Sequence, residues 1–202
     1  MLDAATRRLI DPPLNAAGVA LARYRITANQ VTLLGLALGL GAAGAIWAGL
    51  FGLGFLLVAA SRLADGLDGA VARATQRTDF GGYLDIASDF TFYGAVPLAF
   101  VLHDPAQNGT AGAFLLATFY VNGTTFLGYA VLAEKRGLST AAQGIKNLFY
   151  SRGLLEGTET IAMFLALCLW PSAFPALAWI FGVLCLVTAG QRVMIAARVF
   201  KG

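Results

Sequence analysis

Residues 65–89, DGLDGAVARATQRTDFGGYLDIASD, place four carboxylates inside a chain that is otherwise strongly apolar. They belong to Asp65, Asp68, Asp85 and Asp89. A carboxylate at membrane depth costs roughly 2.5 to 3.5 kcal/mol on insertion scales, so four of them require a compensating partner. A divalent cation, which prefers oxygen ligands, is the partner that this stretch predicts.

The composition outside this stretch is typical of an integral membrane protein. Of the 202 residues, 58% are apolar and only 12% are charged, which lies outside the usual range for soluble domains. A membrane-spanning helix needs about 20 apolar residues. We therefore predict an all-α membrane protein of one domain (1–202), whose bundle (28–200) has six transmembrane helices at 31–50, 51–73, 81–102, 110–133, 154–170 and 176–197. No nucleic-acid partner is expected.

The N-terminal segment, residues 1–27, is predicted to be an amphipathic helix that lies in the membrane interface. Its charges and a break at Pro12-Pro13 exclude a secretory signal. Apolar side chains can rest on the lipid while two arginines meet anionic headgroups; these are Leu14, Val19, Leu21, Tyr24, Arg23 and Arg25. A plain orientation anchor and a part in substrate capture both remain open.

The basic residues predict the orientation under the positive-inside rule. They cluster before the first span, in alternate connections and at the C-terminus, while the connections near 49–52, 103–109 and 171–175 contain no Lys or Arg. Both termini and the acidic stretch are therefore expected on the cytoplasmic side, most simply of a prokaryotic inner membrane. Only Arg62 is left over, one turn before Asp65.

The spacing of the aspartates brings them together in pairs. Asp65 and Asp68 are i, i+3 and Asp85 and Asp89 are i, i+4, so each pair shares one face of a helix. Two facing pairs supply enough oxygens for one or two Mg²⁺ or Mn²⁺ ions, with room for substrate phosphate oxygens. Gly69 would let a nucleotide approach the backbone. The planar guanidinium of Arg73 suits a diphosphate.

Two other interpretations of the acidic stretch agree less well with the sequence. Arg62 and Arg73 can form ion pairs that only hold helices together, but two cations do not balance four anions. A proton or cation pathway predicts polar residues that continue toward the outer face, and the second and third spans have few there. Gly35 and Gly39 in the first span are interpreted as sites of close helix packing.

The string Asp68-Gly69-x2-Ala72-Arg73-x7-Gly81-x3-Asp85-x3-Asp89, with Asp65 three residues before it, resembles the signature of the CDP-alcohol phosphatidyltransferase family. The sequence Asn29-x2-Thr32 is similar to the family's polar entry motif. Six spans with cytoplasmic termini agree with the family over the whole length.

The resemblance implies an enzyme of phospholipid biosynthesis that attaches a phosphatidyl group to an alcohol and releases CMP. Asp65, Asp68, Asp85 and Asp89 would ligate two Mg²⁺ or Mn²⁺ ions, and Asp89 would also act as the general base. The CDP-alcohol donor would be held by Asn29, Thr32, Gly69, Arg73 and Thr78. A homodimer in the membrane lipid is implied as well.

The acceptor alcohol stays open. Lys146, Arg152 and Arg192 are candidates for a basic patch that binds glycerol 3-phosphate or an inositol phosphate; as an alternative, they are snorkelling orientation charges. Glu156 and Glu159 would instead favour an uncharged polyol. Two other functions compete, an aspartate-rich membrane prenyltransferase and a divalent-cation carrier.

Overall fold

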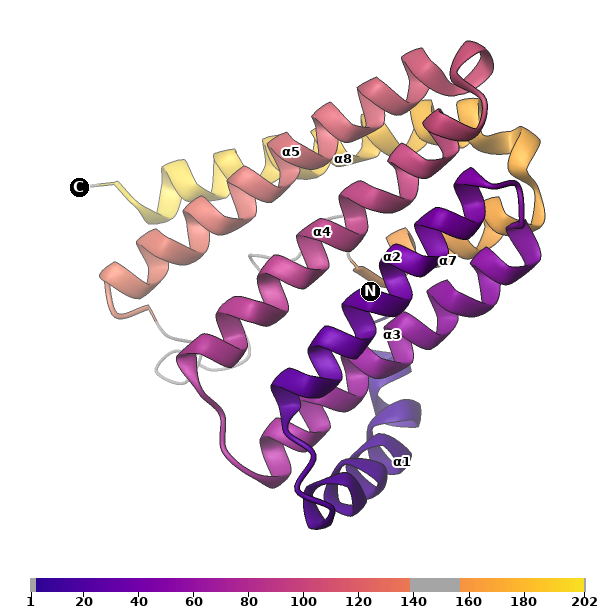
Figure 1. Cartoon of the computed structure of the whole chain (residues 1–202). Helices are drawn as coiled ribbons and strands as arrows, with labels where there is room; N and C mark the ends of the chain where they lie inside the picture. The colour runs from indigo at the N-terminus through magenta and orange to yellow at the C-terminus, as the bar shows by residue number, and fades with distance from the viewer. Residues whose placement is uncertain (1–2, 139–156, 202) are drawn as a thin grey trace.

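The computed structural model describes residues 3–138 and 157–201, and every regular element within them is helical (Figure 1). The all-α prediction is thus confirmed for this part of the chain. The α-helices are α1 (Asp3–Arg23), α2 (Ala28–Trp47), α3 (Phe51–Ala74), α4 (Asp79–His103), α5 (Pro105–Lys135), α7 (Gly157–Leu169) and α8 (Phe174–Val199), with a 3-10 turn η1 (Pro171–Ala173) before the last.

Local sequence signals set the starts of the helices around the acidic stretch. Thr27 and Gln30 form a reciprocal capping box at the start of α2. Thr78 caps α4 by accepting a hydrogen bond from the Gly81 amide at 3.0 Å. Such caps satisfy backbone donors that the first turn leaves without partners. They fix the ends of α2 and α4 next to the C-terminal end of α3.

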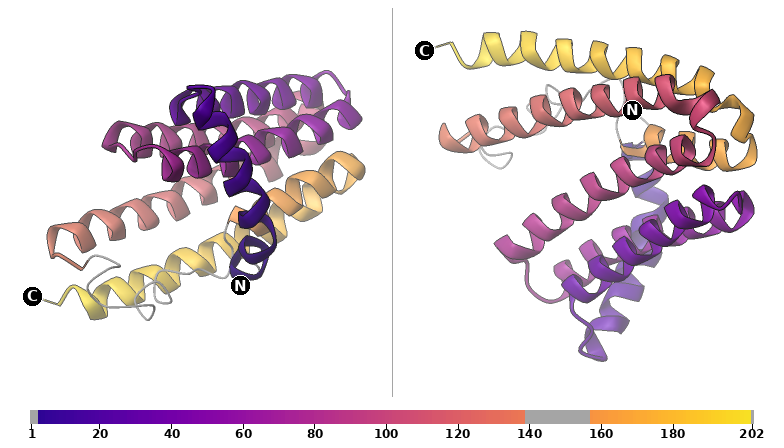
Figure 2. Two further views of the ribbon diagram at one scale, coloured as in Figure 1. Left: turned by 90° about the horizontal axis from the view of Figure 1, so that it is seen from below. Right: turned by 45° about the horizontal axis from the view of Figure 1, so that its top comes forward.

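The helices form one bundle in which α2 packs against α3 and α4, α4 against α5, and α5 against α8. The helix α7 contacts α3. Figure 2 shows that α1 runs across this bundle rather than alongside it, and α1 packs on α3. The end of α1, the start of α2 and the junction of α3 with α4 therefore meet at one end of the bundle.

The centre of the bundle is filled by aromatic and aliphatic side chains from several helices. Phe92, Phe100, Phe164 and Phe174 are completely buried. The rings of Phe100 and Phe174 stack at 5.1 Å. The outward faces are also apolar and include many exposed leucines, valines and aromatic residues. An apolar exterior of this extent suits lipid rather than water as the surrounding medium.

Four described helices are long and apolar enough to cross a membrane: α2, α4, α5 and the η1 to α8 segment. The 24 residues of α3 span about 36 Å at 1.5 Å per residue. However, α3 is less apolar than those four segments because it contains Arg62, Asp65, Asp68 and Arg73. The helix α7 has 13 described residues. The predicted number of six spans therefore stays a prediction.

The N-terminal helix departs from its prediction in two ways. The expected break is wrong, because α1 continues through Pro12 and Pro13. Leu14 packs against Gly66 of α3, and Leu21 packs against the small core around Val71. Both side chains therefore contact other parts of the protein. Contact with α3 was not visible in the sequence because amphipathicity does not say what the apolar face covers.

Close packing at Gly39 gives the first prediction. A Cβ there would lie 2.7 Å from Phe92 Cδ2 and 3.0 Å from Ser61 Oγ. Because both neighbours are fully buried, Gly39→Ala is expected to destabilise the bundle by about 1 to 3 kcal/mol. Thermal unfolding in detergent micelles measures this. Gly44→Ala in the same helix is the control, since nothing lies within 4 Å of its Cβ; equal melting temperatures of the two variants would contradict the prediction.

Candidate active site

Three of the four aspartates form a compact cluster. One carboxylate oxygen each from Asp65 and Asp68 on α3 and Asp85 on α4 can be chosen so that all three atoms lie within 4.8 Å of one another. Asp68 is only 6% exposed. Hard oxygen ligands at this spacing fit a divalent cation such as Mg²⁺ or Mn²⁺. The donor set therefore agrees with the predicted cation site, although no ion is part of the structure.

Thr32 of α2 holds one member of this cluster. Its hydroxyl lies 2.6 Å from Asp68 Oδ2 and donates a hydrogen bond to it in a buried position. Partners of this kind orient the ligands of a cation site, and their loss typically weakens cation binding. The polar entry motif therefore reaches the acidic cluster through Thr32.

Asp89 is not one of the three carboxylates that lie within 4.8 Å of one another. Its Oδ1 is 2.7 Å from Nη1 of Arg62. The same guanidinium nitrogen is 3.6 Å from Asp65 Oδ1. The sequence placed Arg62 near the aspartates but did not show which one it would contact. Among the described residues, the candidate general base is thus paired with an arginine.

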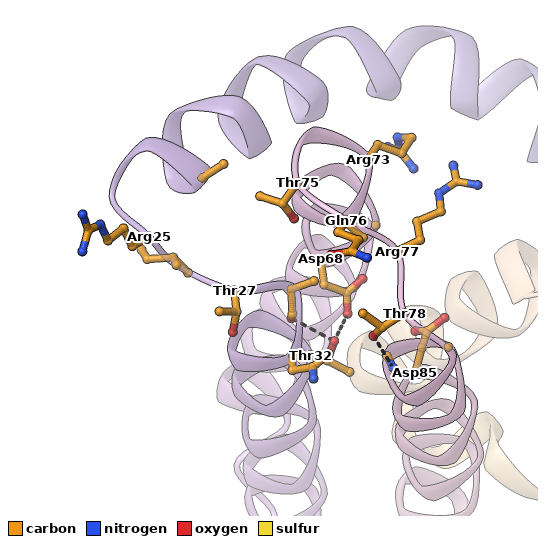
Figure 3. Close-up of a pocket in the computed structure, with 18 residues that line it drawn as sticks. Arg25, Thr27, Thr32, Asp68, Arg73, Thr75, Gln76, Arg77, Thr78 and Asp85 are labelled. Atoms are coloured by element: carbon orange, nitrogen blue, oxygen red, sulfur yellow. Dashed lines mark hydrogen bonds between the residues drawn. The ribbon is translucent and has the colours of Figure 1, made fainter.

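A cavity of about 660 Å³ opens beside the cluster, between the ends of α1, α2, α3 and α4 (Figure 3). Asp68 and Asp85 line it, whereas Asp65 and Asp89 lie one turn farther along their helices and do not. The cavity wall includes all five residues predicted to bind the donor, which are Asn29, Thr32, Gly69, Arg73 and Thr78.

The first turns of α2 and α4 also face this cavity. A helix N-terminus carries a partial positive charge and favours a bound anion. Gly81 in the first turn of α4 sits so close to its surroundings that a Cβ would be 3.0 Å from Thr78 Oγ1 and 3.2 Å from Asn29 Oδ1. The cavity thus combines two acidic side chains with positive helix ends and arginines.

Arg73 is held in place by the N-terminal helix. Its Nε and Nη2 both donate to Asn15 Oδ1, at 3.1 and 2.8 Å. A Cβ on Gly18, also in α1, would lie 2.7 Å from the Ala70 backbone. The helix α1 is therefore packed tightly over the end of α3 that carries Arg73.

The cavity wall also includes residues that were not predicted to bind the donor, among them Arg25, Gln76 and Arg77. Arg77 and Gln76 follow the signature arginine by three or four residues, so their place in the connecting loop was a usable signal. Figure 3 shows Arg77 on the same side as Arg73, while Arg25 extends away from the aspartates.

The candidate acceptor residues are placed only in part. Lys146, Arg152 and Glu156 lie outside the described residues. Arg192 is 8% exposed and donates from Nη1 to the Asn122 side-chain oxygen at 2.7 Å and to its carbonyl at 3.2 Å. It does not line the cavity. Arg192 is thus hydrogen-bonded to α5, and its contact with the acceptor alcohol stays a prediction.

Comparison with known proteins agrees with this arrangement. A model of the CDP-alcohol phosphatidyltransferase family matches residues 25–191. Inner membrane protein YnjF of Escherichia coli (strain K12) is 42% identical over 193 residues, which is 96% of this chain and 94% of that protein. An uncharacterized protein of Aquifex aeolicus (strain VF5) is 36% identical over 110 residues, about half of each chain, at 53%.

The fold is that of a solved synthase. Phosphatidylinositol phosphate synthase PgsA1 of Mycobacterium tuberculosis with bound CDP-DAG has a TM-score of 0.73 and 24% identity, covering 91% of this chain and 93% of that one. Its complex with manganese and citrate has a TM-score of 0.72 and 25% identity, covering 90% and 88%.

Proposed function

The chain belongs to the CDP-alcohol phosphatidyltransferase family, and we propose that it transfers a phosphatidyl or other phospho-alcohol group from a CDP-alcohol to a small polar alcohol. CDP-diacylglycerol is the proposed donor, and CMP is released. The observation that carries this proposal is the position of the acidic cluster at the wall of a cavity of about 660 Å³ that also has arginines and two helix N-termini. The relative with bound CDP-DAG supports the choice of donor.

The cavity is proposed to bind the cytidine diphosphate part of the donor. Arg73 would pair with the diphosphate, since a guanidinium offers parallel donors to phosphate oxygens. Gly69 leaves the nearby backbone open, and the ends of α2 and α4 add positive charge. Asn29, Thr32 and Thr78 supply polar atoms to the same wall.

Asp65, Asp68 and Asp85 are the proposed holders of Mg²⁺ or Mn²⁺, with Asp89 as a further ligand when two ions bind. A cation bound there would neutralise charge on the diphosphate and on the leaving CMP. The manganese complex of the structural relative supports this assignment.

Asp89 is the proposed general base. The acceptor oxygen attacks the phosphorus that carries the lipid or alcohol, the bond from that phosphorus to the CMP oxygen breaks, and the hydroxyl proton passes to Asp89. Asp89 is four residues beyond Asp85, or about 6 Å farther along α4. The reacting phosphorus is therefore expected at the deep end of the cavity.

The acceptor is proposed to be a phosphorylated polyol, either glycerol 3-phosphate or an inositol phosphate. The structural relative's name as a phosphatidylinositol phosphate synthase supports this class. Arg192 is the described candidate for contact with the acceptor phosphate, beside Lys146 and Arg152. Its side chain would have to remain bound to Asn122 while it faced the substrate.

The protein is an integral membrane protein, and we propose that it has six spans in a prokaryotic inner membrane, with both termini and the cavity on the cytoplasmic side. The related inner membrane protein supports the location. The basic ends of α5 and α8 meet, since Arg136 donates to the Phe200 carbonyl at 3.2 Å. A homodimer remains a prediction from the family resemblance.

A divalent-cation carrier is less well supported. Such a carrier needs polar groups across the bundle, but buried Val58, Phe92, Val96 and Phe100 occupy the described parts of α3 and α4 beyond the acidic cluster. A prenyltransferase lacks support from the family match.

The proposed function is tested with purified protein in detergent or liposomes. CDP-diacylglycerol, Mg²⁺ or Mn²⁺, and a panel of glycerol 3-phosphate, inositol phosphate, inositol and serine are supplied, and CMP release is measured. Release that depends on one acceptor is the expected result. Cation flux through liposomes without CMP from any acceptor would support the carrier instead.

The contact between α1 and Arg73 gives a second prediction. Asn15→Ala removes the acceptor of two Arg73 hydrogen bonds, so the KM for the CDP-donor is expected to rise about three- to tenfold, or about 1 kcal/mol. The kcat should stay near that of the wild type because Asn15 does not touch the aspartates. Val19→Ala, exposed on the same helix, is the control. An unchanged donor KM in Asn15→Ala would show that α1 is only an anchor.

A further inference from the structure

Arg62 is a largely buried cation within α3, and the proposed reaction gives it no role. Its side chain is 10% exposed, and it does not line the cavity. A guanidinium at membrane depth is expensive unless it is paired, and residues of this kind usually serve function. The residues that contact Arg62 therefore indicate its function.

The closest partner of Arg62 is Asp89, the proposed base. Nη1 lies 2.7 Å from Asp89 Oδ1 but 3.6 Å from Asp65 Oδ1. The first distance is that of a charge-assisted hydrogen bond, while the second is too long for one. Arg62 thus binds the carboxylate on the opposite helix more closely than the carboxylate on its own.

The guanidinium is itself fixed by a layer of packed residues. It lies over the Phe92 ring, with Cζ 3.9 Å from the ring centroid, and Nη2 donates to Ser61 Oγ at 3.2 Å. The Ser61 hydroxyl donates to the Gly35 carbonyl at 2.7 Å. Phe92 and Ser61 reach these positions because Gly39 has no side chain. The two glycines of α2 therefore help to position Arg62.

We propose that Arg62 is a positioning residue for the transfer reaction, which holds the Asp89 carboxylate in place and keeps a fixed positive charge beside the cation site. This inference rests on the proposed function, because the position of Asp89 matters for the rate only if Asp89 accepts the acceptor's proton. Arg62 acts through Asp89 and not through the donor. Loss of Arg62 should therefore lower kcat and leave donor binding intact.

The positive charge of Arg62 is also expected to weaken cation binding, whereas its contact with Asp89 supports the reaction. A cation close to Asp65 and Asp89 repels a divalent ion in the neighbouring cluster. Removal of this charge should tighten binding of Mn²⁺ while it slows the reaction. A bundle that is merely destabilised would lose both properties together. The opposite signs separate a positioning role from an ion pair that only joins α3 to α4.

The experiment compares Arg62→Ala, Arg62→Lys and a control, Val58→Ala, with the wild type. Val58 is completely buried one turn earlier in α3, so its truncation loosens the same helix without removing charge. Mn²⁺ affinity is measured by electron paramagnetic resonance without donor, donor affinity by equilibrium binding, and kcat by CMP release.

In Arg62→Ala, kcat is expected to fall on the order of 10- to 100-fold, as for a misplaced catalytic group. Its Mn²⁺ affinity should rise several-fold, and its donor affinity should stay unchanged. Arg62→Lys keeps the charge, so its Mn²⁺ affinity should match the wild type while kcat recovers in part. In an Asp89→Asn background, Arg62→Ala should cost little further activity, because the two residues act as a unit.

The inference is overturned if kcat per folded protein in Arg62→Ala stays within about twofold of the wild type, or if its Mn²⁺ affinity falls along with that of Val58→Ala. Failure of the proposed function has a different signature, since the wild type would then release no CMP with any acceptor. In that case the Mn²⁺ comparison still decides, because an unchanged affinity in Arg62→Ala refutes the charge role.

Discussion

Asp89→Asn is expected to lower kcat for CMP release about 100- to 10,000-fold, the range that general-base catalysis typically supplies. The amide keeps the size of the side chain and can still contact Arg62, but it cannot accept the proton of the acceptor hydroxyl. Donor binding should change little, because Asp89 does not line the cavity. The measurement is the initial rate of CMP release at saturating donor and acceptor, together with a separate binding isotherm for the donor.

A neighbouring substitution separates the base from its surroundings. Ser88→Ala removes a buried hydroxyl next to Asp89 in the sequence, and it leaves the carboxylate in place. Its kcat is expected to remain within a factor of about three of the wild type, since its hydroxyl has no assigned part in the proton transfer. If Asp89→Asn retained the activity of Ser88→Ala, another group would have to be the base.

The sequence predicted which aspartates lie together better than it predicted their contacts. The i, i+3 spacing is local, and it correctly placed Asp65 and Asp68 on one helix face, where they lie with Asp85. The fourth predicted member, Asp89, is outside this cluster. The register of α3 against α4 is not local. It decides that Arg62 contacts Asp89 more closely than Asp65, and no spacing within either helix contains that information.

Contacts between distant segments were missed for the same reason. Asn15 binds Arg73 across 58 positions, and Asn122 binds Arg192 across 70. An exposed asparagine on an amphipathic helix has no signal that names its partner. The prediction of a surface-lying N-terminal segment therefore described the composition of α1 but not its packing on α3.

The helix α3 shows why a hydropathy pattern is a weak guide at a functional site. Its charged residues lower its apolar character below that of α2, α4, α5 and α8. Among these residues, Asp65 and Asp68 form the acidic cluster with Asp85 of α4, and Arg62 forms the ion pair with Asp89. Polar groups that weaken the membrane signal are thus the ones expected to carry the chemistry, which agrees with the general behaviour of ionisable residues within membranes.

Removal of divalent cations is expected to reduce CMP release to background, and addition of Mn²⁺ or Mg²⁺ should restore it. Three carboxylates lie within 4.8 Å of one another. Among the described residues, Arg62 makes the closest ion pair near them, and that 2.7 Å pair is with Asp89, outside the cluster. The donor diphosphate adds further negative charge at the same cavity. Without a cation, the clustered carboxylates and the donor diphosphate would repel each other, so the complex of enzyme and donor should not form productively.

Asp68→Asn tests whether the cluster is where that cation binds. The variant loses one anionic ligand and weakens the acceptor of the Thr32 hydrogen bond, so the Mn²⁺ concentration for half-maximal activity should rise on the order of 10- to 100-fold. Asp79→Asn is the matched control, because Asp79 is an exposed carboxylate in the first turn of α4 and lies outside the cluster. Equal Mn²⁺ dependence in the two variants would place the cation elsewhere, and it would remove the physical reason for four carboxylates within an apolar bundle.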